Sequence, residues 1–162
     1  MTCVTMNNLN LNKLYQFLKK ASQSTWASNG ENLDTPERKD FSELDFQEGD
    51  WFYKDSFAGS MRSWGTELIR FQGKPVWNCV YGGGMVKGKD STAHETCVFL
   101  KSALKIPHET LQSARGPETF EKGDWRYVYQ QDGDISLFNG YEEIFYKDEL
   151  VHFYRTLGGM IR

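Results

Sequence analysis

Hydrophobic positions follow a helical period near the start of the chain. Between residues 10 and 22, apolar side chains recur every three or four positions and form one stripe, which consists of Leu11, Leu14, Leu18 and Ala21. Asn10 stands directly before this stripe and is a residue type that caps helix N-termini. We therefore predict a helix that begins after Asn10 and ends near Ser22. Residues 1–9 are polar and are expected to fray.

A second helix is predicted in the middle of the chain. Thr92 and Glu95 have the spacing of a capping box, in which each side chain would bond a free backbone N–H of the first turn. Pro107 cannot continue a helix and is expected to stop it. The apolar stripe between these signals consists of Cys97, Leu100 and Leu104.

Most of the remaining chain has the period of two that is typical of strands. Short turns separate three predicted strands at 49–55, 66–71 and 76–81, which together indicate an antiparallel meander. The run Gly82-Gly83-Gly84 is expected to end this meander and to serve as a turn or a point of tight packing. Three more strands are predicted within 123–134, 140–146 and 150–155. The polar stretch 28–48 is a long connection, which is either an ordered lid over a site or a mobile segment.

The second half of the chain repeats the first. When Gly65 is placed on Gly140, SWGTELIRFQGKPVWNCVYGGGM (63–85) and FNGYEEIFYKDELVHFYRTLGGM (138–160) align without a gap. One such unit cannot cover its own apolar face, whereas two can share a core. We predict an α+β fold made of a duplicated α-β-β-β unit, with antiparallel strands, two packed helices and pseudo-twofold symmetry. A single domain would span 1–162, with repeats at about 10–88 and 89–162.

Composition and charge exclude several classes of partner. The net charge is −3 and the basic residues are scattered, so we expect no direct nucleic acid binding. The N-terminus lacks the features of a signal peptide, and no apolar run is long enough to span a membrane. Three cysteines without paired spacing fit a reducing compartment. We expect a cytoplasmic protein without a membrane association.

Neither the histidines nor the cysteines suggest a cofactor or a metal. His94, His108 and His152 share no metal-ligand spacing and are expected to be surface or capping residues. Cys79 lies in the middle of a predicted strand among apolar neighbours, which is typical of an inert core thiol.

Two equivalent glutamates are the strongest candidates for a site. Glu67 and Glu142 share strand faces with apolar residues, so pseudo-twofold symmetry could direct both carboxylates into one cavity. Arg115, in a turn before Gly116 and Pro117, could reach either acid or an anionic group. The cavity could bind a cation against aromatic rings, or the two glutamates could act as general acid and general base. Alternatively, each glutamate is paired with a turn amide or an arginine for structural reasons only. The predicted aromatic wall consists of Trp51, Tyr53, Trp125, Tyr127 and Tyr146.

The chain resembles a bacterial domain family of unknown function, and the resemblance covers roughly 13–162. The segments that carry it are 55–59 (DSFAG), 65–67 (GTE), 73–77 (GKPVW), 99–104 (FLKSAL), 115–117 (RGP), 138–144 (FNGYEEI) and 158–159 (GG). Thr66 and Cys79 depart from the usual pattern of that family. Members of the family occur alone or behind an Xre-type helix-turn-helix domain, and this chain resembles the stand-alone form. The resemblance implies an α+β domain with a sensing role and names no ligand.

Three functions follow as hypotheses. The first is a module that binds a small molecule or a peptide. The second is an enzyme, a hydrolase or an isomerase, that uses Glu67 and Glu142; the absence of a standard nucleophile–base pair places it lower. The third is a protein–protein module whose open strand edges pair with a partner or with a second copy, which would make a homodimer.

Overall fold

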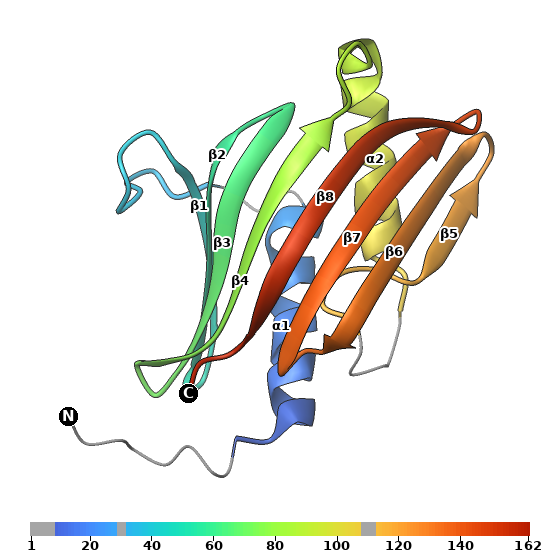
Figure 1. Ribbon diagram of the computed structural model, residues 1–162. Helices are drawn as coiled ribbons and strands as arrows, with labels where there is room; N and C mark the ends of the chain where they lie inside the picture. The colour runs from blue at the N-terminus through green and yellow to red at the C-terminus, as the bar shows by residue number, and fades with distance from the viewer. Residues whose placement is uncertain (1–8, 29–31, 108–112) are drawn as a thin grey trace.

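The computed structural model describes residues 9–28, 32–107 and 113–162. Its main feature is one antiparallel sheet of eight strands in the order β1-β2-β3-β4-β8-β7-β6-β5 (Figure 1). The first four strands are β1 (Ser42–Glu48), β2 (Trp51–Gly59), β3 (Arg62–Phe71) and β4 (Lys74–Met85). The last four are β5 (Thr119–Lys122), β6 (Trp125–Asp134), β7 (Leu137–Tyr146) and β8 (Glu149–Met160). The predicted α+β class and duplicated architecture are confirmed, and each unit has four strands instead of three.

The order of the strands reads the same from both edges, because β4 and β8 meet in the middle. Gly65 and Gly140 are equivalent in the repeat, and the same spacing makes Tyr81 equivalent to Thr156. Tyr81 and Thr156 are also paired with each other across β4 and β8. A pseudo-twofold axis therefore passes between these two residues, at the centre of the sheet.

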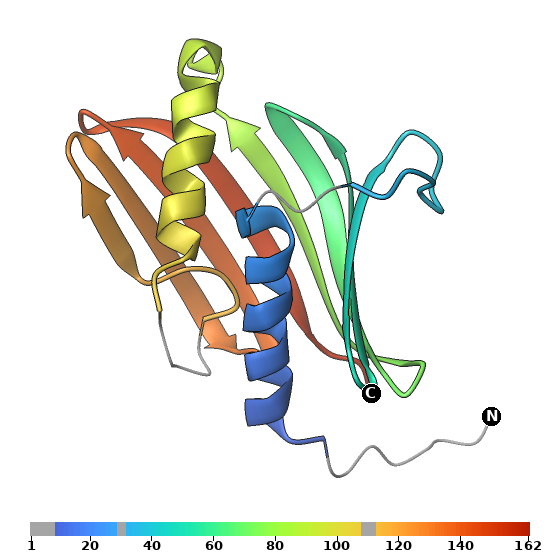
Figure 2. The same ribbon diagram turned by 180° about the vertical axis from the view of Figure 1, so that it is seen from behind.

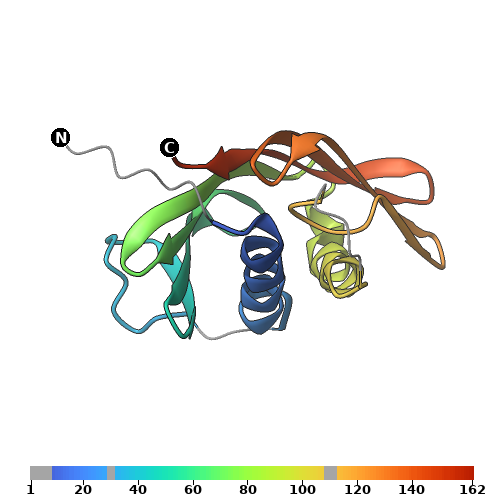
Figure 3. The same cartoon turned by 90° about the horizontal axis from the view of Figure 1, so that it is seen from below.

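Two helices lie side by side on one face of the sheet (Figure 2). They are α1 (Leu11–Ser24) and α2 (Ala93–Leu104), and in an end-on view the sheet bends over both (Figure 3). Asn10 caps α1 as predicted, and its side chain accepts hydrogen bonds from the backbone N–H groups of Asn12 and Lys13. No helix in the described part of the chain is long and apolar enough to cross a membrane.

The predicted capping box of α2 is wrong. The short 3-10 helix η2 (Asp90–Thr92) precedes α2, and the Thr92 hydroxyl donates to the carbonyl oxygen of Lys89 instead of capping the helix. The hydroxyl is engaged within the preceding turn, so it is not available to the first N–H groups of α2.

Each helix packs on the sheet through the same set of aromatic contacts. Under α1, Phe17 contacts Trp51 with ring centroids 5.4 Å apart, and under α2, Phe99 contacts Trp125 at 5.5 Å. Trp51 also contacts Phe71 of β3, and Trp125 contacts the equivalent Tyr146 of β7. On the edge strands, Phe17 contacts Phe46 of β1, and Phe99 contacts the equivalent Phe120 of β5. The two repeats thus form two copies of one helix–sheet interface.

The two strands that the sequence analysis missed, β1 and β5, form the edges of the sheet. β1 lies inside the stretch 28–48, which we predicted to be a connection or a lid. Residues 32–41 do not line either cavity described below; they pack along β1 instead, where the Glu37 N–H donates to Glu43 and Lys54 pairs with Glu37. The lid prediction is wrong for these residues. The prediction of fraying at residues 1–9 falls largely outside the described residues.

The triple glycine of β4 also differs from prediction. Gly82, Gly83 and Gly84 lie inside the strand and do not end it. A Cβ atom on Gly83 would lie 2.2 Å from the carbonyl oxygen of Phe153, and one on Gly84 would lie 2.2 Å from that of Met61. Of the two predicted roles for these glycines, tight packing is therefore confirmed and a turn is not.

Candidate functional site

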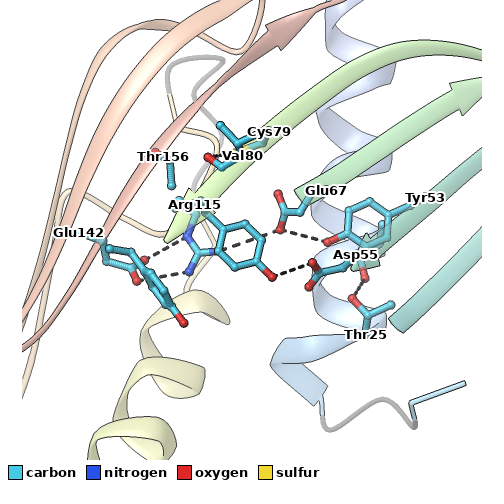
Figure 4. Close-up of polar contacts among 12 residues, drawn as sticks. Thr25, Tyr53, Asp55, Glu67, Cys79, Val80, Arg115, Glu142 and Thr156 are labelled. Carbon is cyan, nitrogen blue, oxygen red and sulfur yellow. Dashed lines mark hydrogen bonds and ion pairs between the residues drawn. The ribbon is translucent and has the colours of Figure 1, made fainter. Parts of the chain in front are cut away.

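One arginine lies between the two equivalent glutamates at the centre of the molecule (Figure 4). Arg115 Nε is 3.2 Å from Glu142 Oε2, and its Nη2 is 3.3 Å from Glu142 Oε1, so this pair is bidentate. Arg115 Nη1 is 4.0 Å from Glu67 Oε1. The side chain of Arg115 is only 13% exposed. The predicted contact of Arg115 with these acids is thus present, and it joins the two repeats.

Each glutamate also accepts a hydrogen bond from a buried tyrosine of the adjacent strand. The Tyr53 hydroxyl donates to Glu67 over 3.0 Å, and the Tyr127 hydroxyl donates to Glu142 over 2.9 Å. Tyr53 and Tyr127 are equivalent in the repeat, as are the two acids. Five of the predicted site residues therefore form one cluster, in which two symmetric Tyr–Glu pairs share Arg115.

Asp55 breaks this symmetry. It lies opposite Glu67 in the register of β2 and β3, whereas Tyr129 takes the equivalent place opposite Glu142. Asp55 is 4% exposed and accepts a hydrogen bond of 2.7 Å from the Tyr81 hydroxyl. Asp55 was not among the predicted site residues, because those were mainly positions that the two repeats share. Its position two residues after Tyr53, and therefore on the same strand face, could have indicated that Asp55 belongs to the site.

Burial and mutual repulsion shift the protonation of these acids. Burial raises the pKa of Asp55 to about 7, and the nearby charge of Glu67 adds to this shift. Burial also raises the pKa of Glu67, although Arg115 and Tyr53 oppose the effect. For Arg115, burial favours the neutral form, but Glu142 and Glu67 outweigh it and raise the pKa well above its usual value. Arg115 is therefore a fixed positive charge.

The charges of the cluster do not balance. Three buried carboxyl groups, those of Asp55, Glu67 and Glu142, surround the single cation Arg115. Burial lowers the pKa of His152, so this neighbour adds no positive charge at neutral pH. Within the described residues, no lysine, arginine or histidine forms an ion pair with Asp55. Buried carboxylates are normally paired, so the first-repeat side of the cluster has a deficit of positive charge.

A narrow central cleft opens onto this side of the cluster. Asp55, Glu67 and Arg115 line its floor, and Tyr81 and Tyr154 line its walls. Its mouth lies between the helical elements, because Ser22 of α1, Leu104 of α2 and Trp26 of the short helix η1 (Trp26–Ser28) also border it. The volume is about 30 Å³, which is room for a water molecule or an ammonium group and not for a whole organic molecule. Glu142 does not line the cleft.

Three predicted wall residues lie elsewhere. Trp51, Trp125 and Tyr146 pack under the helices in the aromatic contacts described above and do not line the central cleft, so their prediction as walls of a cavity beside the two glutamates is wrong. They do share a strand face with the site, but the helices cover that part of the face. Among the described residues, no group of three or more histidine, cysteine, aspartate or glutamate side chains is arranged to hold a metal ion.

The remaining single candidates divide between core and surface. Cys79 is buried as predicted, and burial raises the pKa of its thiol far above the usual range. His94 is exposed. His152, which we expected at the surface, is 7% exposed, so that prediction is wrong. The prediction for His108 lies outside the described residues.

The fold and the cluster together define an α+β protein of two equivalent halves around a shared buried arginine. Comparison with protein families agrees with this duplication. The model of a family described as a domain of unknown function, DUF5680, matches the chain twice, at residues 2–86 and 55–161. The chain belongs to this family. No curated protein and no solved structure matches it.

Proposed function

We propose that the protein binds a small organic cation, whose ammonium group enters the central cleft. One observation carries this proposal: Asp55 is buried and forms no ion pair among the described residues, and the more distant charge of Arg115 only partly offsets the rise that burial causes in its pKa. Glu67 stands opposite Asp55 and already shares its arginine with Glu142. A positively charged ligand group would supply the missing cation.

The walls of the central cleft also suit a cation. Tyr81, Tyr154, Trp26 and Phe57 present aromatic rings around Asp55, and such rings attract cations through their π faces. A primary ammonium carries three N–H donors, which matches carboxylate and hydroxyl acceptors. Ser63 and Tyr154, whose hydroxyl oxygens are 2.6 Å apart, place two such groups beside the carboxylates.

The size of the central cleft limits how the ligand would bind. With about 30 Å³ available, only the charged head would enter without movement of side chains. The organic body would stay at the mouth, against Trp26 and Leu104. This arrangement favours a binding or sensing module, as the resemblance to domains found behind bacterial DNA-binding domains also suggests. It does not favour twin-acid catalysis, because Glu142 is fully buried and bound by Arg115 and Tyr127.

Calorimetric titration with matched ligands tests the proposal. The probe is benzylamine, and its neutral and anionic counterparts of similar shape are benzyl alcohol and benzoate. We expect benzylamine to bind at pH 8 and the other two ligands to bind at least tenfold more weakly. Benzyl alcohol would leave the charge of Asp55 unpaired, and benzoate would be repelled by it, and either effect in a buried site costs more free energy than the loss of one hydrogen bond. Tetramethylammonium extends the series to a cation without N–H donors.

Two variants make the titration specific. Asp55→Asn keeps the size of the side chain and removes its charge, so it should abolish the preference for benzylamine over benzyl alcohol. Asp45→Asn, an exposed acid on the neighbouring strand β1, is the matched control and should leave the preference intact. Equal binding of the amine and the alcohol, or an unchanged preference in Asp55→Asn, would overturn the proposal. The absence of binding by both cations would do the same.

A further inference from the structure

A second and larger cavity lies beside α2, outside the charged cluster. Its volume is about 300 Å³, and its lining is mainly apolar. Met61 of the β2–β3 turn, Met85 at the end of β4 and Leu100 of α2 form much of its wall, and Ala93 and Cys97 line it from the first half of α2. We call this cavity the side pocket. It shares Trp26 and Tyr154 with the central cleft but contains none of the three buried acids.

His152 is one of several polar residues that line the side pocket, together with Ser60, His94, Thr96 and Tyr154. Its imidazole lines the cavity, and its Nδ1 is the one buried side-chain nitrogen or oxygen in the described part of the chain that has no hydrogen-bond partner. An unpaired buried polar atom normally destabilises a fold, so such an atom calls for an explanation. His152 is the repeat equivalent of Trp77, whose indole N–H donates to the Ile135 carbonyl over 2.7 Å. The first repeat satisfies its nitrogen at this position, and the second does not.

We infer that rotation of the His152 ring brings the unpaired nitrogen to the cavity. In the present orientation Nδ1 is shielded from solvent. A half-turn about the Cβ–Cγ bond exchanges the places of Nδ1 and Cδ2 and hardly changes the outline of the ring. The edge contact of His152 with Tyr154, with centroids 4.8 Å apart, is compatible with both orientations. A ligand in the side pocket could therefore reach a ring nitrogen of His152 without a change of the backbone.

We propose that the side pocket binds a small, uncharged, one-ring molecule that carries a single hydroxyl group, with the hydroxyl bonded to the imidazole of His152. A cavity of about 150 Å³ already holds a benzene ring in other proteins, so the volume is sufficient. Methionine side chains adapt to flat apolar ligands through their flexible thioethers. A hydroxyl both donates and accepts, so it satisfies a neutral imidazole in either tautomer. This ligand is neutral and its site lacks Asp55, so the inference is independent of cation binding in the central cleft.

Methyl NMR of the methionines measures this binding directly. The probes are p-cresol and toluene, which differ only by the hydroxyl. Both should shift the methyl signals of Met61 and Met85, and the signal of Met160, which packs with the core beneath α1, should not move. One hydrogen bond between neutral groups corresponds to roughly two- to tenfold in affinity, so we expect p-cresol to bind tighter than toluene by this factor.

Two variants assign the contacts. His152→Phe keeps a ring and removes both nitrogens, so p-cresol and toluene should then bind equally. Ala93→Phe fills the cavity from the first turn of α2 and should abolish both titrations even if the His152 variant does not fold. Asp55→Asn should leave p-cresol binding unchanged, which separates this result from the outcome at the central cleft. The proposal is overturned if neither probe moves Met61 and Met85, if the two probes bind the native protein equally, or if the preference for p-cresol persists in His152→Phe.

Discussion

Asp55 and Tyr129 occupy equivalent positions in the two repeats, and each lies opposite a buried glutamate. The second repeat fills this position with a phenol, which is neutral and bonds Gln131 over 2.8 Å. The first repeat fills it with a carboxyl group, whose burial is unfavourable. Residues selected for stability alone do not concentrate like charges in a core, so we propose that the first repeat is the functional half.

Replacement of Asp55 by asparagine should stabilise the protein at alkaline pH. In the unfolded chain this carboxyl group ionises near its ordinary pKa, whereas the folded protein retains the proton until about pH 7. The unfolded state therefore binds fewer protons between these values, and the stability of the native protein falls as pH rises through this window. The amide that replaces the carboxyl group does not titrate, so Asp55→Asn should gain on the order of 2–4 kcal/mol at pH 8, at about 1.4 kcal/mol per pKa unit.

Urea denaturation at pH 4.5 and pH 8 measures this difference. Near pH 4.5 the folded protein holds Asp55 protonated, and the two proteins should have similar free energies of unfolding. Asp45→Asn should behave like the native protein at both values. A loss of stability in Asp55→Asn at pH 8 would indicate that the carboxylate has a structural role.

The affinity for an organic cation should rise with pH. The ligand needs the ionised form of Asp55, whose pKa is about 7, so below this value binding must displace a proton. We expect the affinity for benzylamine to fall by up to about tenfold per pH unit below 7 and to level off above it. Calorimetry at pH 6 in two buffers with different ionisation enthalpies should also detect proton release. An affinity that is flat from pH 5.5 to 8 would contradict the assignment of the cation to Asp55.

Removal of the central arginine should be strongly destabilising. Arg115→Met leaves Glu67 and Glu142 buried without a cation, and loss of one partner of a buried ion pair typically costs about 3–5 kcal/mol. Acidic pH should reduce the loss, because burial raises the pKa of Glu67 and this carboxyl group can then be protonated. Arg126→Met is the control, since Arg126 pairs at 4.0 Å with the exposed Asp148 and should contribute about 0–1 kcal/mol. Chemical denaturation at pH 5 and pH 8 compares the variants.

Gly140 should not tolerate a methyl group. Its Cβ would lie 2.3 Å from the hydroxyl oxygen of Tyr129 and 2.5 Å from that of Thr156. Gly140→Ala would push these groups apart beside the pseudo-twofold axis, and overpacking of this kind costs about 1–3 kcal/mol. Asn139→Ala, next to it on the exposed face, should change stability by about 0.5 kcal/mol or less. Thermal unfolding of both variants gives the comparison.

The sequence predicted those parts of the fold in which both repeats have a clear hydrophobic period. Both helices, six strands and the symmetric Glu67 and Glu142 follow from period and repetition. The edge strands β1 and β5 were missed because edge positions favour charged residues, which hide the period of two. β1 reads SELDFQE, in which only Leu44 and Phe46 mark the inner face.

The site was only partly predictable for a different physical reason. A strand's period indicates which residues share a face, but it does not indicate where along the strand a helix crosses. Trp51 and Asp55 share a face of β2, yet α1 covers Trp51 while the central cleft exposes Asp55. Asp55 has no acidic counterpart in the second repeat, so the repetition of the sequence did not indicate it. The unpaired nitrogen of His152 depends on packing in three dimensions and leaves no local signal in the sequence.

Arg115 also makes the two halves chemically different, because only the second half supplies the central arginine. Arg115 precedes β5 and contacts both glutamates, whereas residues 32–41, which precede β1, pack along the edge of the sheet. A chain made from two copies of the first half would have no cation at its centre, and one made from two second halves would force two guanidinium groups into a space that holds one. The two halves are equivalent in fold but complementary in charge, because the second half supplies the arginine that the buried glutamates of both halves contact.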